Sequence, residues 1–174
     1  MEFDSGLTYA MPLEVYLQAA VVRGVLETNQ DRLSNYLVLR QGDEVFSLRD
    51  ATLENLYGKA ITAGSDAYLL YMQEVYLIAD LTPQSTGSRS ALGSLYVKKE
   101  SSRVLLSAGP YSLQGKIHLV PGGMLHDLLA DKSSFVPVTD AILLDRPEVG
   151  RRTYLVNRTK IGFMTSSDNV LAER

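Results

Sequence analysis

The chain has no cysteine among its 174 residues, which excludes disulfides, zinc–thiolate sites and cysteine nucleophiles. A chain without cysteine is also typical of a reducing compartment. Glu2 and Asp4 stand where a signal peptide would carry lysine or arginine. No apolar run approaches the roughly 18 residues that a membrane-spanning helix needs. We therefore expect a soluble, cytoplasmic protein with no membrane partner.

Motifs that carry chemistry are lacking as well. Neither G-x-G-x-x-G nor G-x-x-x-x-G-K occurs, so we expect no loop that cradles phosphate. The only histidines, His118 and His126, are expected on a strand and on a short helix, where their side chains need not converge. Two histidines without an evident carboxylate partner make neither a metal site nor a catalytic triad. We expect no cofactor, no metal and no catalytic residue, and hence a protein that is not an enzyme.

Three blocks of sequence recur in the same order in the two halves of the chain. The paired blocks are Val22–Leu26 with Leu113–Ile117, Val45–Leu53 with Phe135–Leu143, and Tyr68–Val75 with Tyr154–Ile161. The offset between the copies falls from 91 to 90 to 86 residues, as expected if only loops changed length. Three blocks in register predict a tandem duplication, which makes the repeated module the unit of the fold.

Each copy predicts the order β-β-α-β-β-β, in an α+β fold with mainly antiparallel strands. Alternating apolar residues at 13, 15 and 17 indicate a first strand. The last two strands of each copy are expected to form a hairpin. These hairpins pair Tyr68–Met72 with Val75–Ala79, and Thr153–Val156 with Lys160–Met164. We expect each module to be a small barrel-like or curved sheet with one short helix.

The short helix of each copy should bury one apolar face. In the first copy, Asp31 is expected as the N-cap and Gly42 as the end of the helix. Leu37 of this helix and Leu128 of the second, which shares its face with Met124, are expected to be deeply buried. The predicted organisation is a first module over 1–81, a polar flexible linker over 82–93, a second module over 94–166 and a frayed tail over 167–174.

A family resemblance is carried by the second copy. Its pattern is Tyr111-x-Leu113-x-Gly115, then Met124–Leu129, then Phe135–Ala141, then Leu155-Val156-Asn157-Arg158-x-x-Ile161. This pattern resembles a bacterial family of unknown function. Members of that family show a glycine strand, an RLSDxLN-like helix, an FLPLTDA-like strand and a VNK/R hairpin. The first copy is similar more weakly, with the RLS start at Arg32–Ser34 but Leu70–Met72 in place of Val-Asn-Arg. The resemblance supports the module boundaries and implies no activity, cofactor or substrate.

Five residues of the repeated blocks are expected to be structural. Gly24 and Gly115 should mark a β-bulge or a close approach of backbones. Asp50 and Asp140 are present in both copies, and each is either a functional acid or an acceptor of backbone N–H groups where a strand turns. Asn157 belongs to the family's hairpin signature.

Basic residues near the end of the second copy are the best candidate for a binding site. They are Arg146, Arg151, Arg152, Arg158 and Lys160, in the last predicted hairpin and the loop before it. Arginines there could fork onto phosphate or carboxylate. The alternative is a solvated hairpin with Asp145 and Glu148 as neighbours.

Charge is distributed unevenly along the chain, whose net charge is −3. Residues 1–80 hold five Lys/Arg and twelve Asp/Glu, a net −7, while residues 81–174 hold twelve and eight, a net +4. This split fits neutral drift after duplication, a second half that attracts anions, or two halves that attract and contact each other.

Two functions remain. We expect a non-enzymatic interaction or assembly module with a protein partner, either another copy or a different protein. The alternative is an anion- or RNA-binding small-barrel module that uses the basic hairpin. RNA is disfavoured because the chain is acidic overall.

Overall fold

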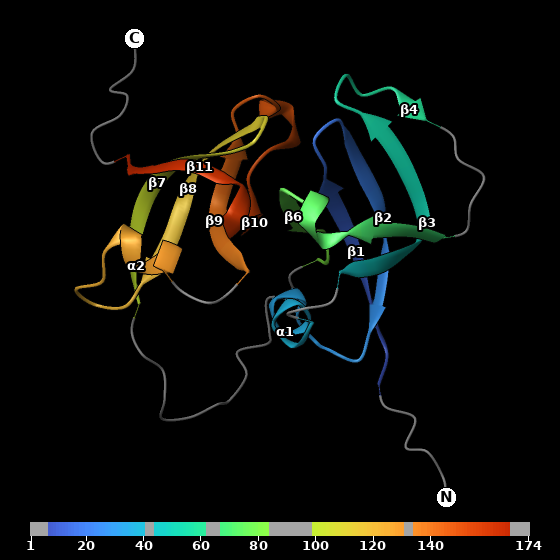
Figure 1. Ribbon diagram of the computed structural model, residues 1–174, viewed down its shortest axis with the longest axis horizontal. Coiled ribbons are helices and arrows are strands. Elements are labelled where there is room, and N and C mark those ends of the chain that lie inside the picture. Colours follow the sequence, from blue (N-terminus) through green and yellow to red (C-terminus); the bar gives the residue numbers. More distant parts are fainter. Residues whose placement is uncertain (1–6, 41–43, 62–66, 84–98, 131–133, 168–174) are drawn as a thin grey trace, which may run out of the picture.

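Antiparallel strands dominate the computed structural model, which describes residues 7–40, 44–61, 67–83, 99–130 and 134–167 (Figure 1). The first half contains β1 (Tyr9–Tyr16), β2 (Ala20–Thr28), α1 (Leu33–Leu39), β3 (Val45–Asn55), β4 (Ala60–Ile61), β5 (Ala67–Tyr71), the 3₁₀ turn η1 (Met72–Glu74) and β6 (Leu77–Asp80). The second half contains β7 (Glu100–Ala108), β8 (Tyr111–Leu119), α2 (Leu125–Ala130), β9 (Phe135–Leu143), η2 (Pro147–Val149), β10 (Arg152–Asn157), η3 (Arg158–Lys160) and β11 (Ile161–Ser166). The predicted α+β class with mainly antiparallel β is confirmed. The two-residue strand β4 was not expected.

The strands form one open sheet in the order β11-β7-β8-β9-β10-β6-β1-β2-β3-β4, with β5 also on β3. It is not closed into a barrel, so the barrel-like alternative is wrong. The reason lies in the last two strands of each half. Within the described residues, β5 pairs with β3, whereas β6 pairs with β1 and β10. The strands β5 and β6 therefore follow each other through η1 without pairing.

The predicted hairpins are wrong for the same reason. In the second half β10 pairs with β9 and β6, while β11 pairs with β7. One turn of 3₁₀ helix separates the strands of each expected hairpin. A backbone hydrogen bond joins this turn to a residue just before the preceding long strand. The N–H of Met72 donates to the carbonyl of Glu44 at 2.8 Å, and that of Arg158 to the carbonyl of Ser134 at 2.9 Å. Each turn is thus tied to the start of the preceding long strand, and the chain crosses to another sheet neighbour.

Strand pairing follows one pattern in both halves: β5-β3-β2-β1-β6 in the first and β10-β9-β8-β7-β11 in the second. The registers agree as well. Gly24 lies opposite Leu13 and Gly115 opposite Val104, and Tyr68 lies opposite Leu48 and Tyr154 opposite Val138. Strand β5 therefore occupies the position of β10, and β6 that of β11.

A bulge interrupts β3 and β9 at their Asp-Ala pairs. The registers shift opposite Gly24 and opposite Gly115, and both aspartates are left-handed, with φ of 49° at Asp50 and 50° at Asp140. Asp tolerates this conformation better than most residues. A Cβ on Gly24 would lie 2.9 Å from the carbonyl oxygen of Arg49, and one on Gly115 would lie 2.7 Å from the Cβ of Ala141. Both features expected at the glycines, a bulge and a close approach, are present.

The two helices differ in burial. Helix α1 buries Leu33, Tyr36 and Leu37, as expected for Leu37. Leu128 is only half-buried and Met124 is 63% exposed, so the prediction of deep burial is wrong for the second helix. Helix α2 has six residues, and none of them is buried.

Asp31 is not the N-cap of α1. The helix begins after Arg32, which has extended backbone and no capping side chain. The Asp31 carboxylate instead accepts a hydrogen bond from the side chain of Asn35 at 3.2 Å. The expected helix end at Gly42 lies outside the described residues.

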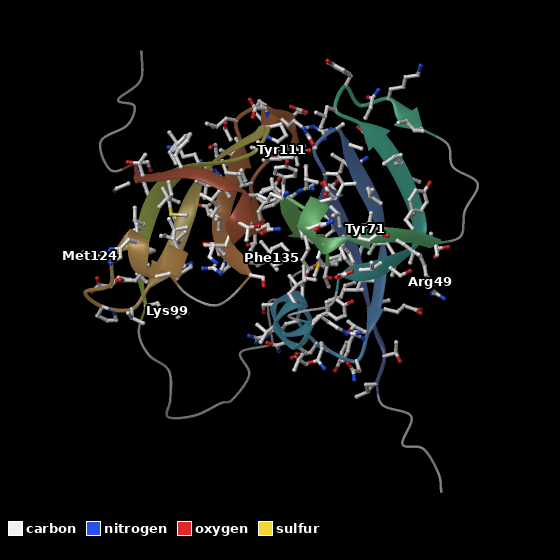
Figure 2. All side chains as sticks on the ribbon, viewed as in Figure 1. Arg49, Tyr71, Lys99, Tyr111, Met124 and Phe135 are labelled. Carbon is white, nitrogen blue, oxygen red and sulfur yellow. The ribbon has the colours of Figure 1, made fainter. Side chains whose placement is uncertain are left out.

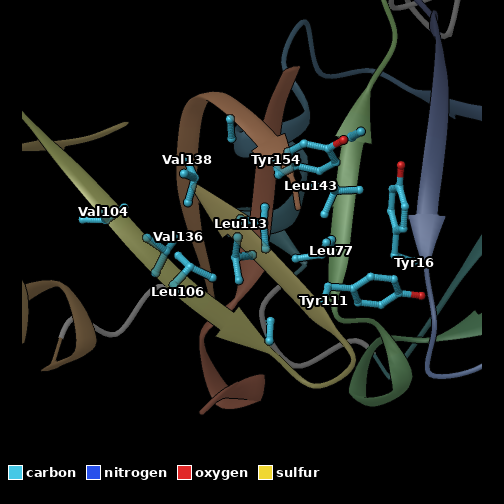
Figure 3. Close-up of a cluster of buried hydrophobic side chains, with 14 of the residues drawn as sticks. Tyr16, Leu77, Val104, Leu106, Tyr111, Leu113, Val136, Val138, Leu143 and Tyr154 are labelled. Carbon is cyan, nitrogen blue, oxygen red and sulfur yellow. The ribbon is translucent and has the colours of Figure 1, made fainter. Parts of the chain in front are cut away.

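Two hydrophobic clusters form the core, and each draws on both halves of the chain. The second-half cluster includes Tyr16, Val21, Leu77 and Ala79 of the first half, some of which appear in Figure 3. The first-half cluster includes Leu155 of β10. Strands β6 and β10 thus supply side chains to both clusters, so the halves share their cores.

The predicted linker lies outside the described residues apart from Thr82 and Pro83, as does the predicted tail after Ser167. Neither helix of the described chain has the length and apolar character required to cross a membrane.

Candidate functional site

The joint between the halves is an edge-to-edge pairing of β6 with β10, which lie side by side at the centre of Figure 1. Tyr154 pairs with Ala79, Leu155 with Ile78, and Val156 with Leu77, and all six side chains are buried. The N–H of Asn157 continues the ladder to the carbonyl of Tyr76 at 2.9 Å. The halves are therefore joined by strand addition, a mode of association that also works between chains.

Asn157 forms hydrogen bonds to the two 3₁₀ turns at the joint, η1 and η3. Its side-chain amide donates to the carbonyls of Val75 at 2.8 Å and Met72 at 3.4 Å, on the first-half side. Its Oδ1 accepts from the N–H of Thr159 at 3.1 Å, within its own turn. Asn157 is 6% exposed, so these bonds satisfy a buried polar group.

Tyrosines fill the joint beside these strands. Tyr16 makes edge-to-face contacts with Tyr111, with ring centroids 5.4 Å apart, and with Tyr154 at 5.8 Å (Figure 3). The hydroxyl of Tyr111 donates to the carbonyl of Leu17, which ties β8 to the first half. Burial raises the pKa of Tyr111 to about 12 against the opposing charge of Arg146, so this hydroxyl remains a donor at neutral pH.

Glu14 is the centre of a buried ionic group at the joint. The carboxylate is reached by Arg152 Nη1 at 2.6 Å, by Arg23 Nε at 2.7 Å and by the hydroxyl of Tyr16 at 2.7 Å. Burial acts to raise the pKa of Glu14, but the hydrogen bonds from Arg23 and Tyr16 and the charges of both arginines outweigh it and hold the pKa below its usual range. Glu14 is therefore ionised and fully paired at neutral pH.

Glu54 forms the second ionic contact across the joint. Arg146 Nη2 lies 3.3 Å from its Oε1, and Arg23 binds its other oxygen. The side chains of Arg146 and Glu54 are 15% and 17% exposed. The acidic first half thus contacts the basic second half through Arg152–Glu14 and Arg146–Glu54, as the third explanation of the charge split predicts.

The five predicted basic site residues do not converge on one site. Arg146 and Arg152 point into the joint, as just described. Arg151 turns to Asp140, Arg158 donates to the carbonyl of Leu129 at 2.8 Å, and Lys160 Nζ lies 5.0 Å from the ring centroid of Tyr76. Of the two acids expected as their neighbours, Asp145 accepts from the N–H of Ser112 at 3.1 Å, and Glu148 lies 3.7 Å from Arg146.

A different basic hollow of about 160 Å³ lies on the β7–β8–β9 face. Its charged residues are Arg103, Lys116, Asp140 and Arg151. Lys116 Nζ is 3.0 Å and Arg151 Nη1 is 3.7 Å from the Asp140 carboxylate. The hydrogen bond from Lys116, with the nearby cations, holds the pKa of Asp140 below its usual value. Three cations thus surround one carboxylate.

Arg103 and Lys116 of this hollow were not among the residues predicted from the sequence. They lie opposite each other on β7 and β8, one position before Val104 and one after Gly115. The pairing of β7 with β8 is the signal that could have revealed them. It sets Arg103 opposite Lys116, next to Gly115, and both then line one hollow with Asp140 of the bulge. In a single sequence the two residues stand 13 positions apart in unremarkable surroundings.

The histidines take separate places. His118 Nε2 lies 2.9 Å from Thr139 Oγ1 on the sheet, and His126 Nε2 lies 3.0 Å from Asp127 Oδ1 on α2. Over the described ranges, no group of three or more His, Asp or Glu side chains is placed to hold a metal ion.

The outer edges of β5 and β11 carry large apolar side chains at the surface. Leu69 is 71% exposed, Tyr71 54% and Phe163 49%. Figure 2 shows Tyr71 on β5, while Phe135 and Tyr111 lie toward the joint. Among the strands that the structure describes, β5 pairs only with β3 and β11 only with β7. The strands β5 and β11 thus each present an edge with no described neighbour, as does the two-residue strand β4, which pairs with β3.

Comparison of the chain with protein-family models, curated proteins and solved structures gave no match.

Proposed function

We propose that the chain is a tandem duplication of one module and works as a non-enzymatic interaction module, which binds protein through its free strand edges. The observation that carries the proposal is the β6–β10 joint. There, an edge strand of one half already binds an edge strand of the other, with its side chains buried. Strand addition supplies affinity from main-chain hydrogen bonds and specificity from alternate side chains.

The composition of the free edges supports this proposal. Soluble proteins usually protect edge strands with charge, proline or bulges, because an open edge recruits other strands. Neither Ala67–Tyr71 nor Ile161–Ser166 contains a charged residue or a proline, although β11 carries one bulge, between Ile161 and Phe163. Edges with so little protection fit a protein whose edges are covered by a partner.

The resemblance to the bacterial family and a cytoplasmic location belong to the same proposal. The resemblance rests on the pattern around Gly115, Asp140 and Asn157, three residues with defined structural places. The cytoplasmic location is supported by the lack of cysteine.

Photo-crosslinking in cells tests the proposed function. A benzophenone amino acid at Leu69 or at Phe163 should give discrete adducts, which mass spectrometry identifies. The same probe at Tyr57, which is 95% exposed on the turn between β3 and β4 and belongs to neither β5 nor β11, is the matched control. Adducts from the edges but not from Tyr57 support an interaction module. No edge-specific adduct at either position contradicts it.

The basic hollow favours a second candidate, the binding of an anion such as phosphate. Its three cations exceed the single charge of Asp140, which leaves a local excess of positive charge. Arginine forks bind phosphate with two parallel hydrogen bonds. This candidate places the anion at Arg103, Lys116 and Arg151 rather than at a basic hairpin.

Thermal unfolding in phosphate tests the second candidate. Phosphate should raise the Tm above that in chloride of the same ionic strength, because a ligand that binds only the folded state stabilises it. The paired variant Arg103→Gln/Arg151→Gln should lose this increase, while Lys59→Gln, on a remote turn, should keep it. An increase that survives in the paired variant would exclude the hollow as the site. Binding of a labelled RNA that disappears in the paired variant and weakens steeply with salt would identify the anion as nucleic acid.

A further inference from the structure

We propose that the partner at the free edges is a second copy of this chain, added head to tail, with β5 of one chain pairing antiparallel with β11 of the next. This inference rests on the proposed function and names its partner. The two edges are complementary because β5 stands where β10 stands in the other half, and β11 stands where β6 stands. The contact between chains would therefore repeat the joint within the chain.

Strand registers give the pairing residue by residue. Leu69 lies opposite Ser47 as Leu155 lies opposite Pro137, and these partners occupy the same place in the repeated block. Met164 lies opposite Leu106 as Ile78 lies opposite Val15. The joint pairs Leu155 with Ile78 and Val156 with Leu77. The corresponding contact between chains pairs Leu69 with Met164 and Leu70 with Phe163.

Burial shows what the free edges lack. Leu155 is 8% exposed in the joint, whereas Leu69, in the same position on the free edge, is 71% exposed. Leu77 is 0% exposed, and its counterpart Phe163 is 49% exposed. A second copy covers both by the same packing that covers their counterparts.

The helices carry the same difference. Leu37 and Val38 of α1 line a small apolar hollow with Phe135, Pro137 and Leu155 of the second half. In the repeat, Leu37 and Val38 of α1 correspond to Leu128 and Leu129 of α2, beside the free edge of β11. The second-half residues of the hollow correspond to Val45, Ser47 and Leu69, beside the free edge of β5. Leu129, Val45 and Leu69 are all exposed. The partial burial of Leu128 follows, because the surface that completes its environment would belong to the next chain.

Charge favours a second copy over an unrelated protein. The free edge β5 belongs to the half with net charge −7, and β11 belongs to the half with net charge +4. Head-to-tail addition therefore sets an acidic half against a basic half, as the joint within the chain does. Opposite charges of this kind speed the encounter and select its orientation more than they add affinity.

The contact between chains should be weaker than the joint. Glu14 lies opposite Arg23, and its counterpart in the second half, opposite Gln114, is Leu105. The buried ionic group around Glu14 thus has no equivalent at the free edge of β11. We infer a reversible association that depends on concentration, which gives a ring if the rotation closes and a filament if it does not.

Sedimentation velocity of the purified full chain tests the proposal. The wild type should shift from monomer to larger species as its concentration rises. Leu69→Lys and Phe163→Lys each place a charge on one edge and should weaken association at least about tenfold, a change equivalent to roughly 1.4 kcal/mol. Tyr57→Lys is the control and should behave as wild type. Both edge residues are exposed, so circular dichroism should show all variants folded. A wild type that stays monomeric throughout the series overturns the proposal.

Mixing the two edge variants separates head-to-tail pairing from a symmetric contact. Leu69→Lys retains an intact β11, and Phe163→Lys retains an intact β5. Each should be monomeric alone, and the equimolar mixture should form a dimer that grows no further. If Phe163→Lys alone dimerises through β5, the contact is symmetric and the proposal fails.

Engineered disulfides test the register on a background without native cysteine. The variant Leu69→Cys/Met164→Cys should give disulfide-linked oligomers under mild oxidation, since opposed residues of an antiparallel pair lie close enough to bridge. Leu69→Cys/Thr165→Cys, one residue out of register, should form them far more slowly. Equal rates would contradict the proposed register.

The two proposals fail in different ways. A purified chain that remains monomeric, combined with edge-specific crosslinks to another protein in cells, overturns the second copy as partner and leaves the interaction module standing. Absence of both association and edge-specific crosslinks overturns both.

Discussion

Arg152 donates to the carboxylate of Glu14 at 2.6 Å, although 138 positions separate the two residues in the chain. Glu14 is 3% exposed, so it depends on Arg152 from the second half and on Arg23 from its own. A buried charge that loses its partners is costly, because the desolvation of the ion is then uncompensated. The joint between the halves is consequently sensitive to changes at a single carboxylate.

Glu14→Gln should lower the free energy of unfolding at neutral pH by about 3–5 kcal/mol, because it leaves two arginine side chains without their shared anion. Urea titration followed by circular dichroism measures this loss. Glu27→Gln, at an exposed surface ion pair with Arg49, is the control and should change stability by less than about 1 kcal/mol. A similar loss in both variants would show that the buried group has no special weight.

The stability that Glu14 contributes should depend on pH. Its pKa is lower in the folded chain than the ordinary value of 4.5, so the unfolded chain binds the proton more readily. The contribution is therefore fully present above about pH 4.5 and is lost as pH falls through the folded pKa. Stability curves of wild type and Glu14→Gln should converge below pH 4.5 and stay parallel above it. A constant difference between the curves across this range would contradict the prediction.

Gly115→Ala should destabilise the second half by about 1–3 kcal/mol, since its new methyl group would meet the Cβ of Ala141 at 2.7 Å. Ala141→Gly in the same chain removes that contact and should recover part of the loss. A double-mutant cycle measured by denaturant unfolding gives the coupling between the two sites. Additive effects would mean that the close approach is not what makes glycine necessary.

Asp50 should tolerate glycine better than alanine, because its φ is 49°. Asp50→Gly should leave the Tm nearly unchanged, while Asp50→Ala should cost about 1–2 kcal/mol for a Cβ in the left-handed region. Differential scanning calorimetry distinguishes the two. If both variants lose the same stability, the carboxylate rather than the backbone is the reason for aspartate at this place.

Leu37→Ala should cost about 2–5 kcal/mol, the usual range for a core leucine. Leu128→Ala should cost clearly less in the monomer, because Leu128 is half-buried. At concentrations where chains associate, the Leu128 variant should also weaken association. Equal costs in dilute solution would show that α2 is packed as tightly as α1.

The parts of the fold that depend on the local pattern of apolar residues, glycines and repeats could be predicted from the sequence. The alternation of apolar residues and the repeated blocks predicted the succession of strands along the chain apart from β4, the two short helices and special places for Gly24 and Gly115. The hairpins were predicted wrongly because a short, mostly polar segment is compatible both with a hairpin turn and with one turn of 3₁₀ helix. Only the strand neighbours decide between them, and β6 finds its neighbour β10 more than 70 residues away.

The site was predicted less well, for a related reason. The five basic residues are close in sequence, yet their side chains go to different partners. Arg151, which precedes β10, lies near Asp140 in the hollow, while Arg152, the first residue of β10, binds Glu14 at the joint. The carboxylates that pair with Arg152, Arg146 and Arg151 come from β1, β3 and β9, and a single sequence does not reveal that placement.

The shared cores have a consequence for synthesis on the ribosome. Leu77 and Ala79 leave the exit tunnel well before Tyr154 and Val156, which pair with them across the joint. At roughly 5–20 residues per second, the earlier strand waits on the order of ten seconds for the later one. During that interval the nascent chain carries an apolar strand edge that only its own unsynthesised half can cover, so this protein should depend on the cell's nascent-chain chaperones more than a chain of independently folding domains.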